Sequence, residues 1–149
     1  MLFLLRVALG LLSLLAACRS TAPTSQSSPT TPLASLRNTR WVLQTLNGQP
    51  APTPTQGEVY LLLRANELNT EGNAGCNRFR GSFELPADGQ LRFGPLLSTK
   101  MACPALATET SFLNALANTR TYQISGDTLR LFAEAATQPE AVLHAVYLR

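Results

Sequence analysis

Short runs of apolar residues alternate with turn signals through most of the chain, and this pattern predicts a mainly β domain. The first run, residues 41–43, ends at Asn47-Gly48. Residues 59–63 are apolar on both faces, which is typical of a central strand. Two hairpins are predicted by alternating segments, 82–85 with 91–93 around Asp88-Gly89 and 121–124 with 128–131 around Gly126-Asp127. A final run, 142–148, is expected to close the sheet.

One segment between the hairpins has a helical period instead. In residues 104–118, apolar side chains recur at spacings of three, four and seven, and these are Leu106, Phe112, Leu113, Leu116 and Ala117. Thr108 is a candidate cap, and Pro104 is an alternative first position. The stripe indicates core packing. We therefore predict an α+β fold, a compact and mainly antiparallel sheet or partial barrel, with one helix packed against it as a plug or lid.

The N-terminus has the features of an export signal. Arg6 precedes an apolar run at 7–15 that is too short to span a membrane, and Ala16-Ala17 provides the small residues of a cleavage site. Leu-Ala-Ala-Cys, ending at Cys18, resembles the lipobox of bacterial lipoproteins, in which the cysteine is lipidated and becomes the mature N-terminus. We predict a cleaved signal peptide at 1–17 and a lipid anchor on Cys18, because several acyl chains hold a protein firmly at a bilayer. An ordinary secreted protein and an uncleaved anchor are the alternatives.

The residues after Cys18 predict a tether followed by one domain. Ser, Thr, Pro, Gln and Ala dominate residues 18–35, which bury too little apolar surface to fold and read as a flexible spacer. The domain is assigned to 36–149. Of the 12 basic residues, Arg6 and Arg19 precede it, which leaves ten against nine acidic residues. This near-neutral balance, without a run of basic residues, argues against nucleic-acid binding. A monomer is expected.

Glycine and asparagine crowd into the segment 71–83, which a plain strand does not require. Gly72, Gly75 and Gly81 predict a tight, specific loop or bulge, while their spacing is not that of a dinucleotide-binding or phosphate-binding motif. Arg78 and Arg80 share strand parity around Phe79. Asn77, Arg78, Phe79 and Arg80 are therefore a candidate binding loop for an anion or a partner, with a solvated strand face as the alternative.

Cys76 and Cys103 are the cysteines left once Cys18 is lipidated. Export to an oxidising compartment favours a disulfide between them, which would close a loop of 27 positions and contribute roughly 3–4 kcal/mol. Two buried free thiols and a reactive or redox pair are alternatives, although the spacing is not that of a Cys-x-x-Cys motif.

No set of residues identifies a catalytic or metal centre. His144 is the one histidine and is expected to be packed in the last strand; a pair with Cys76 or Cys103 needs a free thiol, and a zinc site lacks a fourth ligand. The carboxylates Glu71, Glu84 and Glu109 show no paired pattern. We predict no cofactor and no metal.

Several motifs together resemble the META domain family, which includes HslJ-like heat-inducible lipoproteins of the bacterial envelope. The resemblance covers residues 36–131, and its motifs are Asn38-Thr39-x-Trp41, Leu46-Asn47-Gly48, Gly75-Cys76-Asn77-x-Phe79-x-Gly81, Phe83, Leu96-x-Ser98-Thr99-x-Met101-Ala102-Cys103, Glu109, Phe112-Leu113, Leu116, Tyr122 and Ile124. The resemblance implies a mainly antiparallel β domain with one helix and a link to the envelope, stress or antibiotic tolerance. It implies no enzyme activity. In Gram-negative lipoproteins, Arg19 after the cysteine points to the outer membrane.

Three functional hypotheses follow. The first is a lipid-anchored, non-enzymatic envelope domain that binds an envelope protein or a cell-wall component and supports integrity under stress. The second is an enzyme or thiol-redox factor that uses Cys76 and Cys103. The third is an inhibitor that presents residues 72–81 to a periplasmic hydrolase.

Overall fold

The computed structural model describes residues 34–52 and 57–147, which belong to one compact unit. The predicted signal peptide, Cys18 and nearly all of the predicted spacer lie outside the described residues. Ala34 is buried in the core, and its N–H donates to the carbonyl of Gly126 at 3.2 Å. The packed part therefore includes residues ahead of the expected start at Leu36.

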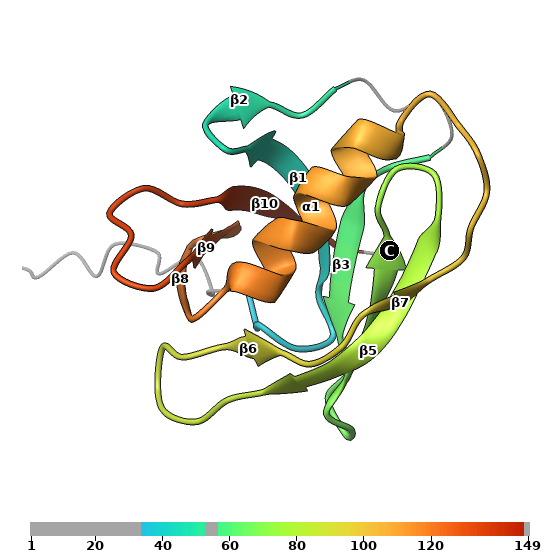
Figure 1. The fold of residues 1–149 in the computed structure, drawn as a ribbon. Coiled ribbons are helices and arrows are strands. Elements are labelled where there is room, and N and C mark those ends of the chain that lie inside the picture. Colours follow the sequence, from blue (N-terminus) through green and yellow to red (C-terminus); the bar gives the residue numbers. More distant parts are fainter. Residues whose placement is uncertain (1–33, 53–56, 148–149) are drawn as a thin grey trace, which may run out of the picture. The chain divides into compact units, whose positions relative to one another are not determined.

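The described residues form strands and one helix, which Figure 1 shows in chain order. The elements are β1 (Arg40–Leu46), β2 (Gln49–Pro50), β3 (Tyr60–Leu63), β4 (Asn69–Asn73), β5 (Arg78–Glu84), β6 (Arg92–Phe93), β7 (Leu97–Ser98), α1 (Leu106–Asn118), β8 (Thr121–Ser125), β9 (Thr128–Phe132) and β10 (Ala141–Val146).

The strands make a nearly closed antiparallel barrel. Their order is β6-β5-β4-β3-β1-β10-β9-β8, with β2 beside β1 and β7 beside β5. The segment that leads into β6 returns to β8: Gln90 bridges Thr121, and the N–H of Tyr122 donates to the carbonyl of Gly89 at 2.9 Å. This contact almost removes the free edges of the sheet, which otherwise invite pairing with other chains. The predicted α+β class and partial barrel are confirmed.

The turns predicted at Asn47-Gly48 and Gly126-Asp127 are present, because each contains the positive φ that short hairpins need. Asn47 and Gly48 both have positive φ, 49° and 76°, and connect β1 to β2 in a two-residue hairpin. Gly126, at φ 58°, begins the equally short turn between β8 and β9. The strand predicted at 59–63 is confirmed as central, because β3 pairs with both β1 and β4.

Two expectations about the strands need correction. The final strand does not close the barrel; β10 lies between β1 and β9, and the closure is made by residues 89–91 against β8. The segment 71–83 is expected to hold a tight loop or bulge, and no strand is predicted where it begins. It begins within β4, which pairs with β3 through residues 70–73 and with β5 along its whole length.

The barrel interior and one side of α1 form a single hydrophobic core. Trp41 is fully buried, and its indole Nε1–H donates to the carbonyl of Leu36 at 3.0 Å, so its polar atom is satisfied. Phe79 on β5 meets Phe112 on α1 edge to face, with ring centroids 6.1 Å apart. Leucines of β1, β3, β9 and β10 fill the remaining volume, namely Leu43, Leu61, Leu63, Leu129, Leu131 and Leu143.

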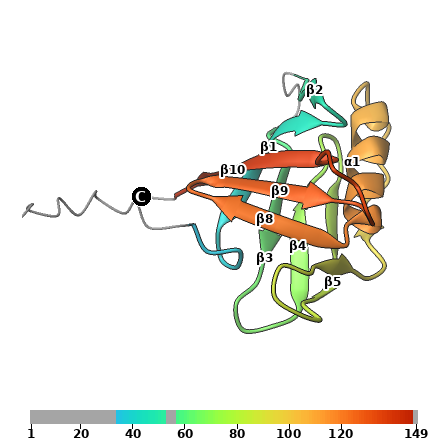
Figure 2. The same cartoon turned by 90° about the vertical axis from the view of Figure 1, so that its left-hand side faces the viewer.

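The helix lies across one mouth of the barrel, and Figure 2 shows the segment that starts at Ala34 at the opposite mouth. The buried residues of α1 are Glu109, Phe112, Ala115 and Leu116. The predicted Phe112 and Leu116 are confirmed, whereas Leu106 and Ala117 are exposed. Residue Ala105 precedes the helix without a side-chain cap, so neither Thr108 nor Pro104 has the predicted role. Among the described residues, no helix has the length and apolar character to span a membrane.

Gly72 is required where β4 passes between β3 and β5. A Cβ on this residue would lie 2.0 Å from the carbonyl oxygen of Tyr60 and 2.6 Å from the ring of Phe79. Both neighbours are fixed, one as backbone and the other in the core. A side chain here therefore has to displace β3 or the aromatic contact with α1.

Gly72→Ala is expected to lower the free energy of unfolding by about 2–4 kcal/mol, because overpacking against backbone forces the strands apart. Gly48→Ala is the matched control. Its Cβ meets nothing within 4 Å, so it loses only about 1 kcal/mol from its positive φ. Urea unfolding followed by tryptophan fluorescence measures both, and equal losses would contradict the close approach at Gly72.

Candidate functional site

The glycine-rich segment is a tight connection between β4 and β5. The N–H of Ala74 donates to the carbonyl of Asn77 at 2.9 Å, and the side chain of Asn73 accepts from the N–H of Gly75 at 2.7 Å. Gly75 has φ 118°, a conformation that side chains disfavour. The glycine and the asparagines thus close the chain on itself within four residues, as the tight loop predicted for this segment requires.

Asn77 is the centre of a buried hydrogen-bond cluster. It is 1% exposed. Its Nδ2 donates to both carboxylate oxygens of Glu109, at 3.2 and 3.0 Å, and to the carbonyl of Met101 at 3.2 Å. Its Oδ1 accepts from the hydroxyl of Thr99 and from the N–H of Met101, each at 2.8 Å. We call Asn77, Thr99, Met101 and Glu109 the Asn77 cluster.

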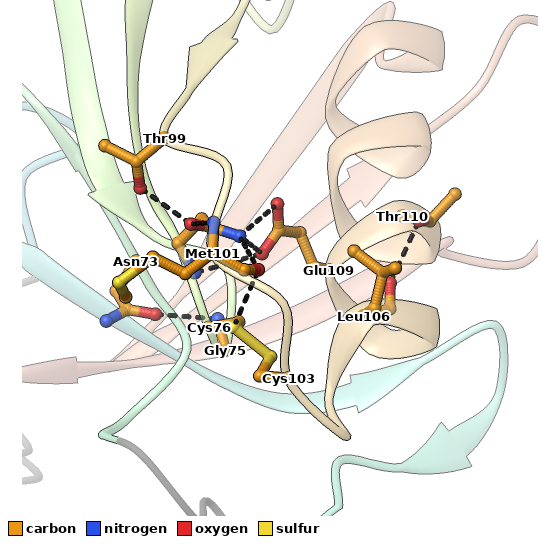
Figure 3. Close-up of a disulfide and its surroundings, with 10 residues drawn as sticks. Asn73, Gly75, Cys76, Thr99, Met101, Cys103, Leu106, Glu109 and Thr110 are labelled. Carbon is orange, nitrogen blue, oxygen red and sulfur yellow. Dashed lines mark hydrogen bonds between the residues drawn. A yellow bond between two sulfur atoms is a disulfide. The ribbon is translucent and has the colours of Figure 1, made fainter.

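Glu109 brings the helix into this cluster. It is 4% exposed and lies in the first turn of α1, where the helix dipole favours a negative charge. Its Oε2 also accepts from the N–H of Asn77 at 3.0 Å. Figure 3 shows Thr99, Met101 and Glu109 pointing toward one place beside the disulfide. A carboxylate considered as a possible catalytic group is therefore engaged in holding α1 to the start of β5.

A disulfide joins Cys76 and Cys103 next to the cluster, with the two Cα atoms 6.2 Å apart. Cys76 is 4% exposed, and the residue that follows it is Asn77. The bridge fastens the β4–β5 connection to the segment that leads into α1. Free thiols and a redox pair, the alternatives left open by the sequence, both require this bond to be broken.

The four residues of the candidate binding loop divide by strand parity. Asn77 and Phe79 are buried, and their side chains are engaged in internal contacts, the first in the cluster and the second in the core. Arg78 and Arg80 are exposed on the outer side of β5. The prediction of a binding loop is therefore corrected to two side chains on the outer face of a strand.

An open cleft of about 440 Å³ lies over these two arginines. Tyr60 of β3, Glu71 of β4 and Leu97 and Ser98 of β7 also line it. Glu71 stands opposite Arg80 in the strand register, but its Oε1 contacts Nη2 of Arg64 instead. In the described part of the chain the ion pairs are Arg40 with Glu58 and Arg64 with Glu71, so Arg78 and Arg80 face the cleft without a carboxylate partner.

The remaining titratable candidates lie apart from one another. His144 is exposed on β10 and not packed as expected, because it falls on the outer face of the strand; β1, β3 and β4 separate it from β5. Glu84 is exposed at the far end of β5. Tyr147 donates to Asp127 at 2.7 Å, and this hydrogen bond raises the pKa of the exposed phenol. Across residues 34–52 and 57–147, no group of three His, Cys, Asp or Glu residues has a geometry for a metal ion.

Sequence reasoning singled out Cys76, Cys103 and the glycines but missed the role of Glu109 and the pairing of Asn77 with it. One signal was present. Glu109 lies three positions before Phe112 and seven before Leu116, so an acidic residue interrupts the apolar stripe of the helix. An acid at such a position needs a buried partner.

Comparison with known proteins gives a family and two structural neighbours. The model of the META domain matches residues 34–145. An NMR structure of a protein from Burkholderia xenovorans is 27% identical, with a TM-score of 0.60, and the match covers 85% of this chain and 98% of that one. A second NMR structure, 20% identical with a TM-score of 0.56, covers 75% of this chain and 93% of that one and supports the fold alone. A search of curated protein sequences found no match.

Removing the bridge by Cys76→Ala with Cys103→Ala is expected to lower the free energy of unfolding by about 3–4 kcal/mol, because the unfolded chain regains the freedom of a 27-residue loop. Urea unfolding with and without reductant measures the change. Reductant should bring the wild type to the stability of the variant and leave the variant unchanged. Equal stability of the oxidised wild type and the variant would contradict a stabilising bridge.

Asn77→Ala is expected to cost about 2–4 kcal/mol of folding free energy. The buried Glu109 carboxylate keeps the backbone N–H of residue 77 but loses its hydrogen bonds to the side-chain amide, and the N–H of Met101 loses its acceptor. Asn77→Asp should be equally harmful, since it places a second carboxylate beside the first. Asn73→Ala, which removes one hydrogen bond, is the matched control at about 1 kcal/mol. A loss at Asn77 no larger than at Asn73 would show that the cluster does not stabilise the domain.

Proposed function

Because the chain belongs to the META domain family, we propose that it is a lipid-anchored protein of the cell envelope whose domain binds a partner and catalyses no reaction. The partner is an envelope protein or a cell-wall component, and binding supports envelope integrity under stress or antibiotic exposure. The anchor is Cys18, and in a Gram-negative host the domain faces the periplasm from the outer membrane. The domain acts as a monomer, without a cofactor and without nucleic acid.

The observation that carries this proposal is the cleft over Arg78 and Arg80. Two charged side chains without an acidic partner stand on a rigid strand, and rigid display reduces the entropy that a binding surface loses. The most distinctive residues of the segment, Cys76 and Asn77, are already engaged in covalent and hydrogen bonds. Their chemistry supports a structural role beneath the cleft rather than a reactive one.

The anchor is supported by the Leu-Ala-Ala-Cys sequence at residues 15–18. A flexible spacer would follow it and would let the domain reach partners away from the bilayer. Export by the same N-terminal signal would place the domain in an oxidising compartment, in which the Cys76–Cys103 bridge persists.

In host membranes, the mature protein is expected to carry a diacyl or triacyl mass on Cys18, and Cys18→Ala should lose both that mass and the membrane association. Intact mass spectrometry after alkylation, with and without reductant, makes the measurement. Labelling of Cys76 and Cys103 only after reduction is expected. An unlipidated mature protein would overturn the anchor, and immediate labelling of both thiols would favour the redox alternative.

The role under stress is tested in a deletion strain challenged with detergent and with a cell-wall antibiotic. Wild type should restore survival, whereas Arg78→Glu with Arg80→Glu should not. Arg92→Glu with Arg130→Glu, on β6 and β9 outside the cleft, is the matched control and should restore survival. Full rescue by the cleft variant, or no defect in the deletion strain, would overturn the proposed role of this surface.

A further inference from the structure

We propose that the cleft over β5 binds an extended acidic peptide segment of a partner protein, with carboxylates at alternate positions that pair with Arg78 and Arg80. This assignment rests on the proposed function, which makes the cleft a binding surface. It names the chemistry of the occupant, and it follows from the charge of the cleft, the spacing of its two arginines and its mixed lining.

The charge of the cleft is complementary to carboxylates. Arg78 and Arg80 lie on the same outer face of β5, and the carboxylate nearest in the strand register, Glu71, is bound to Arg64. Within the described residues no acidic side chain forms an ion pair with either of them. Guanidinium groups bind carboxylates through two parallel hydrogen bonds, so each arginine offers a directional site.

The spacing of the two arginines matches an extended chain. Residues i and i+2 of a strand project side chains to one face about 6.4–6.8 Å apart, and alternate side chains of an extended peptide repeat at the same distance. A helix does not offer the same match at alternate positions, because its residues i and i+2 do not face the same side.

The lining contains more than positive charge, and this favours a peptide over a phosphate-rich surface. Glu71, whose carboxylate is paired with Arg64, has further acceptor lone pairs that suit peptide N–H groups, which a phosphate group lacks. Leu97 on β7 is 66% exposed at the rim and offers an apolar contact for the residue between two carboxylates. Arginine is enriched in protein interfaces.

The backbone that carries the arginines is held in place before any ligand arrives. Arg78 directly follows Asn77, and its carbonyl accepts from the N–H of Thr99, which also donates its hydroxyl to Asn77. The side-chain amide of Asn77 and the Cys76–Cys103 disulfide thus connect β5, which carries the arginines, to the segment that follows β7, the strand with Leu97 at the rim. Binding therefore needs little rearrangement of the backbone.

The test uses the full mature protein in detergent and a fluorescent peptide, Thr-Glu-Val-Glu-Leu-Glu-Thr, whose acidic residues alternate. Anisotropy is expected to show saturable binding that weakens with salt. A peptide of the same composition, Glu-Thr-Val-Glu-Leu-Thr-Glu, has no two acidic residues at alternate positions. It should bind about tenfold more weakly, because its neighbouring carboxylates project to opposite faces. Equal binding of the two peptides would overturn the extended register.

Variants identify the surface. Arg78→Glu and Arg80→Glu should each weaken binding at least tenfold, while Arg92→Glu and Arg130→Glu leave it unchanged. The double variant Arg78→Glu with Arg80→Glu should gain binding to the peptide in which lysine replaces each acidic residue. This gain also guards against a variant that merely fails to fold. Unchanged affinity in the arginine variants, or no gain by the double variant, would overturn the proposal.

Binding to vesicles with anionic phospholipids tests whether the arginines bind a lipid headgroup rather than an acidic peptide. Arginine-dependent binding of such vesicles by Cys18→Ala protein, without binding of the alternating peptide, would replace the peptide with a lipid headgroup. Failure of the peptide site and failure of the proposed function give different combinations of results. Failure of both peptides together with loss of rescue by the cleft variant would leave a binding module with another ligand. Peptide binding together with full rescue by that variant would leave this site intact and overturn its role under stress.

Discussion

The side-chain amide of Asn77 is the contact on which the arrangement around the barrel mouth depends. Its donor group binds Glu109 of the helix, and its acceptor oxygen binds Thr99 and Met101 of the segment that leads there. A buried carboxylate is costly unless it is hydrogen-bonded, and here the amide satisfies it. Aspartate lacks the donor and alanine lacks both groups. One short side chain that donates and accepts at once therefore fixes three segments that are distant in sequence.

Most of the β architecture was predictable because its signals are local. Asn47-Gly48 and Gly126-Asp127 encode two-residue turns through backbone preferences, and the strands on either side alternate or are continuously apolar. β4 escaped prediction because its sequence, NTEGN, is polar and contains glycine. It is a strand because β3 and β5 pair with it on both sides, so its conformation is imposed by neighbours rather than by propensity. The position of β10 depends on the same kind of distant pairing.

The candidate site was only half predictable for a related reason. Cysteine and glycine indicate a disulfide or a constrained backbone position by residue type alone, and Cys76, Cys103 and Gly72 were predicted to be important on that basis. The partnership of Asn77 with Glu109 spans 32 positions and follows no spacing rule. The phase of the helix was also uncertain, because periodicity alone does not say which stripe meets the barrel. The contact of Phe112 with Phe79 and the bond of Glu109 to Asn77 select it.

Structure and recognition share one strand in this protein. β5 alternates buried Phe79 and Phe83 with exposed Arg78 and Arg80, so a shift of one residue would bury the arginines and expose the rings. The register is set from both sides of the strand. Gly72 admits Phe79 against β4, and Asn77, directly before β5, hydrogen-bonds to Glu109 of α1. The buried contacts that stabilise the domain are therefore the same contacts that aim the two arginines outward, which is why a motif made of structural residues can still define where a partner binds.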